Sequence, residues 1–439
     1  MSDWRKEYEA KLVAPETAVE VIKSGDRVAF TTGNEPTALA LALLARAGDL
    51  KDLTIFLPTP SRDFGWYDPG MEESFSIEVG YILPVVREMV AQKRCDYNVQ
   101  TPRVEYGPFD RGTDVIFVEV SPPDKHGFCS FGASLWNKKR EIRNAKKVLA
   151  EVNHHLIRTG GDNFIHVSEI DYFVEHASTG RAPGATDLLG RKAEGPTEVE
   201  KSIAEQAGAL IKDGDTLQIG VGSTSEWVAR LGVLDNKLEL GWHSETTPRG
   251  IIKLVREGVV TGSRKALHPG KAVATAVGGG AADDMAFVDG NPIFELYSAE
   301  YVIDSRTIAA HENQVAVNSA VAIDLTGQIA AESIGPTMIS GTGGHLAFAT
   351  GAYLSKGGRY ICVLPSTAKG GKASRIVPFF EPGTIVSVPR TLANYVITEY
   401  GVVDLRGKTQ RQRAEALIGL AHPDFRVKLH KAARRLFWP

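Results

Sequence analysis

A glutamate at the end of a strand-like run offers the clearest opportunity for chemistry in this sequence of 439 residues. Glu245 closes an apolar run that includes Leu240 and Trp242, and a turn containing Pro248 and Gly250 follows it. Open α/β sheets carry their ligand chemistry at the carboxyl ends of the strands, where this carboxylate is expected to lie. Considered alone, Glu245 is better explained as a cap of the next helix, so its role depends on the elements that position it.

Several common catalytic motifs are absent or incomplete. No G-x-S-x-G motif occurs, which excludes the nucleophile elbow of serine hydrolases. Residues 401–409 resemble a P-loop, but five residues rather than four separate the first glycine from the Gly-Lys-Thr triplet. The turn at residues 220–222 lies between a predicted strand and a predicted helix, yet Ser225 occupies the third glycine position of a dinucleotide-binding motif. Neither phosphate-binding motif is therefore supported.

The overall composition excludes several classes of partner. With 50 Lys and Arg against 53 Asp and Glu, and a formal net charge of -3, the chain lacks the basic field that nucleic-acid binding needs. Three scattered cysteines suit neither a disulfide framework nor a four-ligand zinc site, and the adjacent His154 and His155 suit no shared metal. Residues 1–12 are charged, and no apolar run is long enough to span a membrane. We expect a cytoplasmic protein without a metal or a membrane partner.

Two pairs of similar segments indicate an internal duplication. Residues 23–33 read KSGDRVAFTTG, and residues 212–222, which lie 189 positions later, read KDGDTLQIGVG. Each predicts the end of a helix, a short strand, a glycine-rich turn and a further helix. In the second pair, a strand-like run leads to an Asp-x-x-Gly turn at residues 124–127, and the same pattern recurs at residues 324–327. The alternative is a chance similarity of strand–turn–helix units.

Strand-like runs alternate with helical patterns, which is typical of mainly parallel sheets covered by helices. A capping box formed by Thr197 and Glu200 begins one of these helices. The stretch 177–196 is rich in glycine and proline, which makes it the best candidate for the boundary between two domains. We place the domain boundary near residue 187, which gives domains 1–187 and 188–439. The strand-like runs are residues 115–120, 147–152, 216–221 and 360–364.

An ordered set of motifs carries a resemblance to a known family. In the second half these are residues 242–245 (WHSE), 315–320 (VAVNSA), 340–344 (SGTGG), 374–378 (SRIVP), 396–402 (VITEYGV), 405–408 (LRGK) and 421–426 (AHPDFR). In the first half they are residues 121–127 (SPPDKHG), 160–162 (GGD) and 165–168 (IHVS). The set resembles the acetyl-CoA hydrolase/transferase family, in particular its 4-hydroxybutyrate CoA-transferase branch, over nearly the whole chain.

The resemblance implies an α/β fold of two related CoA-transferase-type domains (NagB/RpiA/CoA-transferase-like), with mainly parallel sheets covered by helices. It also implies that Glu245 is a nucleophile that holds CoA as a thioester between two carboxylic acids. Glycine turns would supply backbone N–H donors for the oxyanions, and a basic cluster would meet the phosphates of CoA. Plain turn geometry and a solvated loop are the respective alternatives. The residues assigned to oxyanion or CoA binding are Gly220, Val221, Gly222, Gly343, Gly344, His345, Phe348, Lys369, Lys372 and Arg375.

Two departures from the branch pattern affect the expected acid specificity. Arg249 precedes Gly250 where the branch usually has Asp before Gly, and residues 345–348 read HLAF where it usually has Gln-x-Asp-Phe. We therefore assign Arg249 to acid binding, as the partner of a second carboxylate on a dicarboxylic substrate. The resemblance implies an acyl-CoA:carboxylate CoA-transferase, by resemblance a homodimer, which uses coenzyme A as a substrate and has no permanently bound cofactor. The alternatives are an acyl-CoA hydrolase and a non-catalytic CoA-binding protein.

Overall fold

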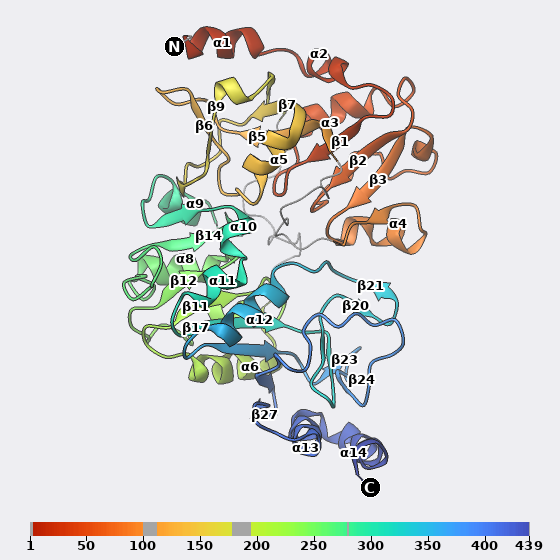
Figure 1. Cartoon of the computed structure of the whole chain (residues 1–439), viewed down its shortest axis with the longest axis vertical. Coiled ribbons are helices and arrows are strands. Elements are labelled where there is room, and N and C mark those ends of the chain that lie inside the picture. The colour runs from red at the N-terminus through yellow and green to blue at the C-terminus, as the bar shows by residue number, and fades with distance from the viewer. Residues whose placement is uncertain (1–2, 100–111, 178–194, 279–280, 439) are drawn as a thin grey trace. The chain divides into compact units, whose positions relative to one another are not determined.

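The computed structural model describes residues 3–99, 112–177, 195–278 and 281–438 (Figure 1). The chain forms two compact units, of which the first comprises Met1–Gly190 and Thr275–Glu300 and the second comprises Arg191–Ala274 and Tyr301–Pro439. The predicted boundary near residue 187 lies outside the described residues. The sequence pattern did not indicate that the segment Thr275–Glu300 belongs to the first unit.

The first unit is built on a seven-stranded parallel sheet in the order β10-β7-β5-β1-β2-β3-β4. Its strands are β1 (Arg27–Phe30), β2 (Leu53–Leu57), β3 (Phe75–Val79), β4 (Asp96–Tyr97), β5 (Thr113–Val120), β7 (Ala145–Val152) and β10 (Tyr172–Glu175). Its α-helices are α1 (Trp4–Lys11), α2 (Pro15–Ala18), α3 (Thr37–Leu44), α4 (Arg87–Ala91), α5 (Lys138–Asn144) and α9 (Ala282–Val288). The short strands β6 (Phe128–Ser130) and β9 (Phe164–His166) pair with each other, as do β8 (Gly160–Gly161) and β16 (Phe294–Leu296).

The second unit repeats this plan with strands in the order β27-β26-β22-β17-β11-β12-β14, of which only β27 runs antiparallel to its neighbour. These strands are β11 (Thr216–Ile219), β12 (Gly241–His243), β14 (Ala272–Ala274), β17 (Gln314–Ser319), β22 (Arg359–Val363), β26 (Tyr395–Thr398) and β27 (Gly401–Asp404). The helices are α6 (Glu198–Leu210), α7 (Glu226–Arg230), α8 (Arg249–Arg256), α11 (Ser305–Ala309), α12 (His345–Leu354), α13 (Gln410–Leu420) and α14 (Pro423–Phe437), and α10 (Ala299–Val302) spans the boundary.

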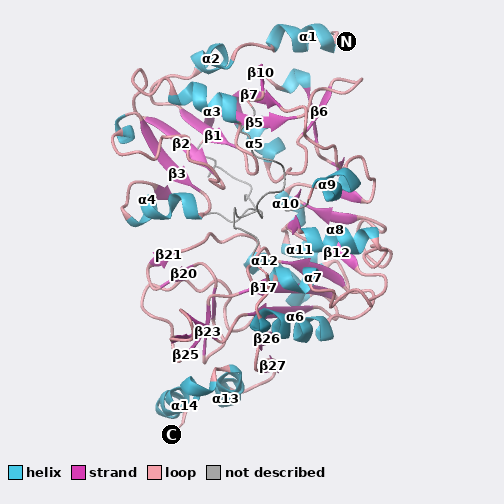
Figure 2. Cartoon of the chain, turned by 180° about the vertical axis from the view of Figure 1, so that it is seen from behind, coloured by secondary structure: helices cyan, strands magenta, loops and turns pink. Residues whose placement is uncertain are grey.

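Helices cover the second sheet, and its central strands are accordingly buried on both faces. Strands β11 and β22 are buried along their whole length, as expected for parallel strands between helical layers. Helix α6 packs on β22, β26 and β27, and α12 packs on β17 and β22. Helices α13 and α14 pack together near the C-terminus (Figure 2). Among the described helices, none is long and apolar enough to cross a membrane.

The predicted duplication is reproduced in the pairing of the strands. In the first unit, Val28 of β1 is level with Val115 of β5, and in the second unit Leu217 of β11 is level with Val315 of β17. Val28 and Leu217 occupy equivalent positions in the two similar segments of the sequence. The fold class is therefore confirmed as two related α/β units with mainly parallel sheets.

The two Asp-x-x-Gly turns also have the same hydrogen bonds. The side chain of Asp124 accepts from the backbone of the residues two and four positions later, and Asp324 does the same at 2.9 and 3.0 Å. Gly127 and Gly327 donate back to the carbonyl groups of these aspartates, and both have a positive φ that favours glycine. Because the two turns share both their hydrogen bonds and a positive φ at glycine, chance similarity of the two sequence segments is a poor explanation.

Candidate active site

Neighbouring strands of the second unit end at one edge of the sheet, where polar residues follow them. The register pairs Leu217 with Trp242, and Gly220 and Glu245 each lie three residues beyond this pair, just past the ends of β11 and β12. On its other side, Gly220 lies so close to Asn318 that a Cβ atom would overlap the Asn318 amide oxygen. Since β11, β12 and β17 are parallel, all three ends lie at the carboxyl edge, where α/β sheets bind ligands.

Glu245 is held at this edge by the beginning of a helix. Its Oε2 accepts a hydrogen bond of 2.8 Å from the backbone N–H of Gly344, which lies 99 positions later in the sequence. Gly344 is the N-cap of α12, whose first N–H groups have no acceptor within the helix. The partial positive charge at a helix N-terminus also favours a carboxylate. The structure thus brings together two of the residues that the sequence assigned to the site.

Burial dominates the electrostatics of the Glu245 carboxyl group. It raises the pKa of Glu245 from 4.5 to about 7, although the Gly344 N–H opposes the rise by stabilising the ionised form. The side chain nevertheless remains partly accessible. A carboxyl group with this pKa is about half ionised at pH 7, and its carboxylate is more basic than that of an ordinary glutamate.

Gly344 could not be replaced by a larger residue without displacing the glutamate. A Cβ atom at this position would overlap Glu245 Oε2, and it would lie only 3.2 and 3.3 Å from side-chain carbon atoms of Ile303 and Phe348. The φ of Gly344 is -85°, which every residue adopts readily. Glycine is therefore required here for close approach and not for backbone conformation.

The turn after β11 presents one unused backbone donor. Gly220 N–H donates to Val317, and Gly222 N–H donates back to Gly220. Gly222 also lies too close to the Ser319 hydroxyl to accept a side chain. Val221 N–H makes no hydrogen bond with any residue in the described part of the chain. Within this turn, Val221 is thus the available donor for an oxyanion beside Glu245.

The interior behind Glu245 contains two neutral histidines. The ring of His243 lies 4.6 Å from that of His311, and its Nε2 is 2.9 Å from the carbonyl oxygen of Val302. Burial lowers the pKa of both imidazoles, that of His311 to about 3. Phe348 packs against His243 and is completely buried, so it contributes to this interior and does not line the accessible surface. The uncharged surroundings explain why the pKa of Glu245 is high.

His345, the first residue of α12, points its ring into the protein. Its Nε2 lies 2.6 Å from the hydroxyl of Tyr360 in β22, and burial lowers the pKa of His345 to about 4. The His345 side chain, which the sequence analysis assigned to oxyanion or CoA binding, is thus hydrogen-bonded to a buried tyrosine. Sequence reasoning missed Tyr360 because it lies within a run of apolar strand residues.

The predicted basic cluster consists of two exposed lysines and one arginine that is hydrogen-bonded to backbone carbonyl groups. Lys369 and Lys372 are exposed at the turn between the short strands β23 (Thr367–Ala368) and β24 (Ala373–Ser374). The Arg375 guanidinium donates to the carbonyl groups of Thr367 and Val321, at 3.2 and 3.1 Å. The lysines are accessible to an anion, whereas Arg375 ties the hairpin to the end of β17.

Arg249 is exposed at the first position of α8. The next residue, Gly250, faces α7, because a Cβ atom there would overlap the carbonyl oxygen of Ala229. Successive residues of a helix point in directions about 100° apart, so Arg249 projects from a different part of the α8 surface than Gly250. The long side chain is therefore accessible to a ligand.

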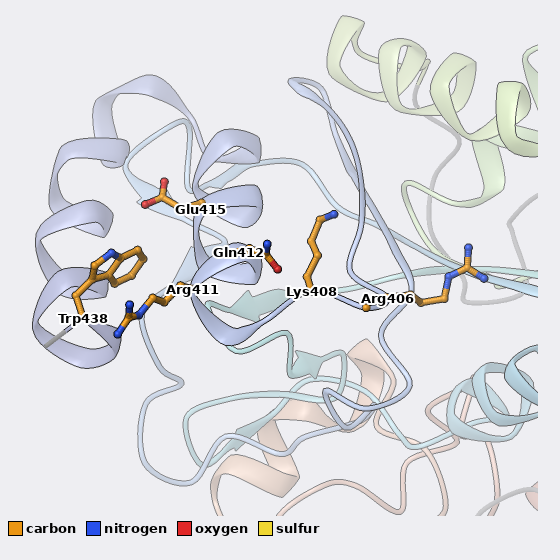
Figure 3. A pocket seen from close by; sticks show the side chains of 7 residues that line it. Arg406, Lys408, Arg411, Gln412, Glu415 and Trp438 are labelled. Carbon is orange, nitrogen blue, oxygen red and sulfur yellow. The ribbon is translucent and has the colours of Figure 1, made fainter.

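An open depression of about 510 Å³ lies near α13 (Figure 3), and two of its three cations, both arginines, already have partners. Arg406 pairs with Asp404 at 2.8 Å, and the Arg411 guanidinium lies over the ring of Trp438. The P-loop-like segment is no phosphate cradle, because its first residues form β27 and Thr409 caps α13 with its own side chain. The lining residues are Arg406, Gly407, Lys408, Arg411, Gln412, Glu415 and Trp438.

No group of three or more His, Cys, Asp and Glu side chains is arranged to hold a metal ion within the described residues. Of the adjacent histidines noted in the sequence, His154 lies 3.4 Å from Glu175. The described groups at the Glu245 edge include the carboxylate itself and the backbone N–H groups of Gly344 and Val221.

Comparisons with known proteins give matches to one family in both halves of the chain. Residues 1–180 match the acetyl-CoA hydrolase/transferase N-terminal domain, and residues 280–433 match the C-terminal domain of the same name. The chain is 40% identical to the 4-hydroxybutyrate coenzyme A transferase of Clostridium kluyveri, over 99% of this chain and 100% of that one. It is 35% identical to the succinyl-CoA:cyclohexane-1-carboxylate CoA transferase of Geobacter metallireducens, over 99% and 97%.

Two solved structures resemble the whole fold. The crystal structure of RipA from Yersinia pestis has a TM-score of 0.90 and 32% identity, and the match covers 100% of both chains. That of 4-hydroxybutyrate CoA-transferase from Porphyromonas gingivalis has a TM-score of 0.80 and 32% identity, and it covers 99% of this chain and 100% of the other.

Proposed function

The chain belongs to the acetyl-CoA hydrolase/transferase family, and we propose that it moves CoA between an acyl-CoA and a small carboxylic acid through Glu245. One observation carries this proposal: the Glu245 carboxylate lies at the carboxyl edge of the sheet and accepts a hydrogen bond from the backbone N–H of Gly344, the N-cap of α12. The names of the relatives, which are CoA transferases, support the same reaction.

The first half of the reaction transfers CoA to the protein. The Glu245 carboxylate attacks the thioester carbonyl carbon, and the C–S bond breaks to give an acyl-glutamyl anhydride and the CoA thiolate. The thiolate then attacks the glutamyl carbonyl carbon, which releases the first carboxylic acid as its carboxylate and leaves a glutamyl-CoA thioester. Neither step requires a net proton transfer.

The second half repeats these steps with the acceptor. The acceptor carboxylate attacks the glutamyl thioester, the thiolate leaves, and its attack on the acceptor's carbonyl restores the Glu245 carboxylate. Each addition forms an oxyanion, which backbone N–H donors stabilise most effectively when they are already oriented. Gly344 N–H and Val221 N–H are the donors that this edge offers.

Transfer should depend on pH through the ionisation of Glu245. Because the pKa of its carboxyl is about 7, the nucleophilic carboxylate is the minor form at pH 6 and the major form at pH 8. We expect kcat/KM to rise through an acidic midpoint near 7 and to be about tenfold lower at pH 6 than at its plateau. A midpoint near 4.5, measured with saturating acceptor, would contradict this expectation.

The test of the proposed function is the intact mass of the protein after incubation with acetyl-CoA or succinyl-CoA and brief borohydride treatment. Borohydride reduces a glutamyl thioester to an alcohol, with the loss of one oxygen and the gain of two hydrogens. We expect this small mass loss in the wild type and not in Glu245→Ala. Acyl-CoA consumption without the mass change would indicate direct hydrolysis or another nucleophile, and no consumption at all would favour a CoA-binding protein.

We further propose that Arg249 pairs with a second carboxylate of the substrate. It is an exposed cation four residues after Glu245, and a guanidinium binds carboxylates in a bidentate manner. Replacing Arg249 with Met should raise the KM for a dicarboxylate such as succinate by about tenfold to a hundredfold, as expected for the loss of a charge-assisted pair. The KM for a monocarboxylate such as butyrate should hardly change. Equal effects on both acids would refute the pairing.

A further inference from the structure

The peptide that binds Glu245 lies between two flexible residues. Its N–H belongs to the bond that joins Gly343 to Gly344, and glycine has the least restricted backbone of all residues. Gly343 adopts a φ of +55°, which favours glycine, whereas Gly344 has an ordinary φ of -85°. Two consecutive glycines do not by themselves fix the direction of the N–H group, so this direction must be set by neighbouring contacts.

The residue before the glycine pair is anchored by its side chain. The Thr342 hydroxyl donates a hydrogen bond of 3.0 Å to Oε2 of Glu332. Glu332 is itself buried, and its backbone carbonyl accepts from the N–H of Ile339 at 2.8 Å. The loop is therefore held to a fixed interior group immediately before Gly343.

The residue after the pair is anchored in the same way. The 2.6 Å contact between His345 and Tyr360 ties the first residue of α12 to β22, the strand beneath the helix. Tyr360 is completely enclosed, and its own N–H donates to the side chain of Asn394. One anchor thus stands on each side of the two glycines.

We propose that these two hydrogen bonds form a bracket that aims the Gly344 N–H at the Glu245 carboxylate, which makes Thr342 and His345 positioning residues for the transfer of CoA. The direction of the Gly344 N–H follows from contacts that all lie within the second unit. The effect of this direction on CoA transfer rests on the function proposed above. His345 therefore acts through Gly344 and makes no direct contact with substrate.

Loosening either anchor has a defined electrostatic consequence. The Gly344 N–H stabilises the ionised carboxylate, so a weaker hydrogen bond should raise the pKa of Glu245 further. The ionisable groups on the elements and loops that meet there include His243 on β12 with its neighbour His311, His345 on α12 with its partner Tyr360 on β22, Glu332, which holds Thr342, and Arg249, Lys253 and Arg256 on α8. All three imidazoles are neutral where Glu245 titrates, because burial lowers their pKa values. None of these imidazoles therefore obscures the titration of Glu245.

The test compares variants that lose a single hydroxyl group. Tyr360→Phe and Thr342→Val each remove one anchor and keep nearly the same volume. Ser355→Ala is the matched control, because it removes a buried hydroxyl at the opposite end of α12, where Ser355 bonds the carbonyl of His311. His345→Gln should preserve the bond to Tyr360 through its amide, whereas His345→Leu should not. The pKa of Glu245 is measured by NMR on protein with ¹³C-labelled glutamate carboxyl groups, with the signal assigned by Glu245→Gln.

We expect the pKa of Glu245 to rise by about 0.5 to 1 in Tyr360→Phe, Thr342→Val and His345→Leu, as for a weakened hydrogen bond to a carboxylate. Their kcat/KM should fall by about twofold to fivefold at pH 7 and approach the wild type at pH 9. His345→Gln and Ser355→Ala should titrate like the wild type. A lower Tm with an unchanged pKa of Glu245 in all three anchor variants would overturn the bracket.

The titration does not depend on enzymatic activity. A wild-type protein that transfers no CoA would refute the proposed function, and the bracket would still be tested by the NMR measurement. Conversely, normal transfer together with an unshifted pKa in the anchor variants would leave the function intact and refute the bracket.

Discussion

Replacing Glu245 with glutamine is expected to lower kcat for CoA transfer by at least about 10⁴-fold, the scale of loss when a nucleophile is removed. The amide has nearly the same shape as the carboxylic acid and can still accept from Gly344 N–H. It has no anionic oxygen to attack a thioester, however, so neither the anhydride nor the glutamyl-CoA thioester can form. The measurement is the initial rate of acyl-CoA exchange with saturating acceptor at pH 8.

The stability of this variant provides the control for folding. The folded-state pKa of Glu245, about 7, lies above the ordinary value of 4.5, so ionisation of the carboxyl costs stability progressively as the pH rises between these values. Glutamine avoids this cost. Its Tm should therefore equal that of the wild type at pH 4 and exceed it at pH 8. A stable variant that retains more than about a hundredth of the activity would assign the nucleophile to another residue.

Replacing Gly344 with alanine should have the second largest effect, a loss of about 10² to 10³ in kcat, comparable to the removal of one oxyanion-hole donor. The added methyl group would occupy the position of Glu245 Oε2, so the carboxylate must move and its bond to the N–H is lost. The backbone conformation at Gly344 suits alanine, so the chain should still fold. Steady-state kinetics and a thermal melt of the same preparation separate these effects.

Gly419→Ala is the matched control for this substitution. Gly419 lies in α13, and a Cβ atom there would meet no atom within 4 Å. Alanine in a helix interior is more stable than glycine by about 0.5 to 1 kcal/mol, so this variant should be active and slightly more stable. Wild-type turnover by Gly344→Ala would show that the contact between Gly344 and Glu245 is not needed for the reaction.

The features that the sequence predicted correctly depend on contacts between near neighbours. The capping box of Thr197 and Glu200 begins α6 as expected, since both of its hydrogen bonds lie within three positions. The turns at Asp124 and Asp324 formed for the same reason. Buried parallel strands are continuous apolar runs, so their positions could be read directly, and the repeat of these patterns predicted two related units.

The candidate site was only partly predictable. The position of Glu245 after an apolar strand indicated ligand chemistry, and the ordered motifs assigned its role by resemblance. The engagement of Arg375 with backbone carbonyls, the burial of Phe348 and the partnership of His345 with Tyr360 were not foreseen. Residue type suggested that these side chains bind ligand, but their packing partners decide which of them are accessible.

By itself, the sequence determined the elements and their order, because short-range hydrogen bonds and apolar periodicity depend on consecutive residues, and the motifs that carry the family resemblance singled out Glu245. The tertiary structure alone decided that Gly344 meets Glu245 across 99 positions, that buried and neutral side chains raise the pKa of this glutamate, and that Thr342 and His345 flank the contact with anchors. These properties depend on distances and dielectric surroundings, which arise only when parallel strands place distant segments at one edge of a sheet.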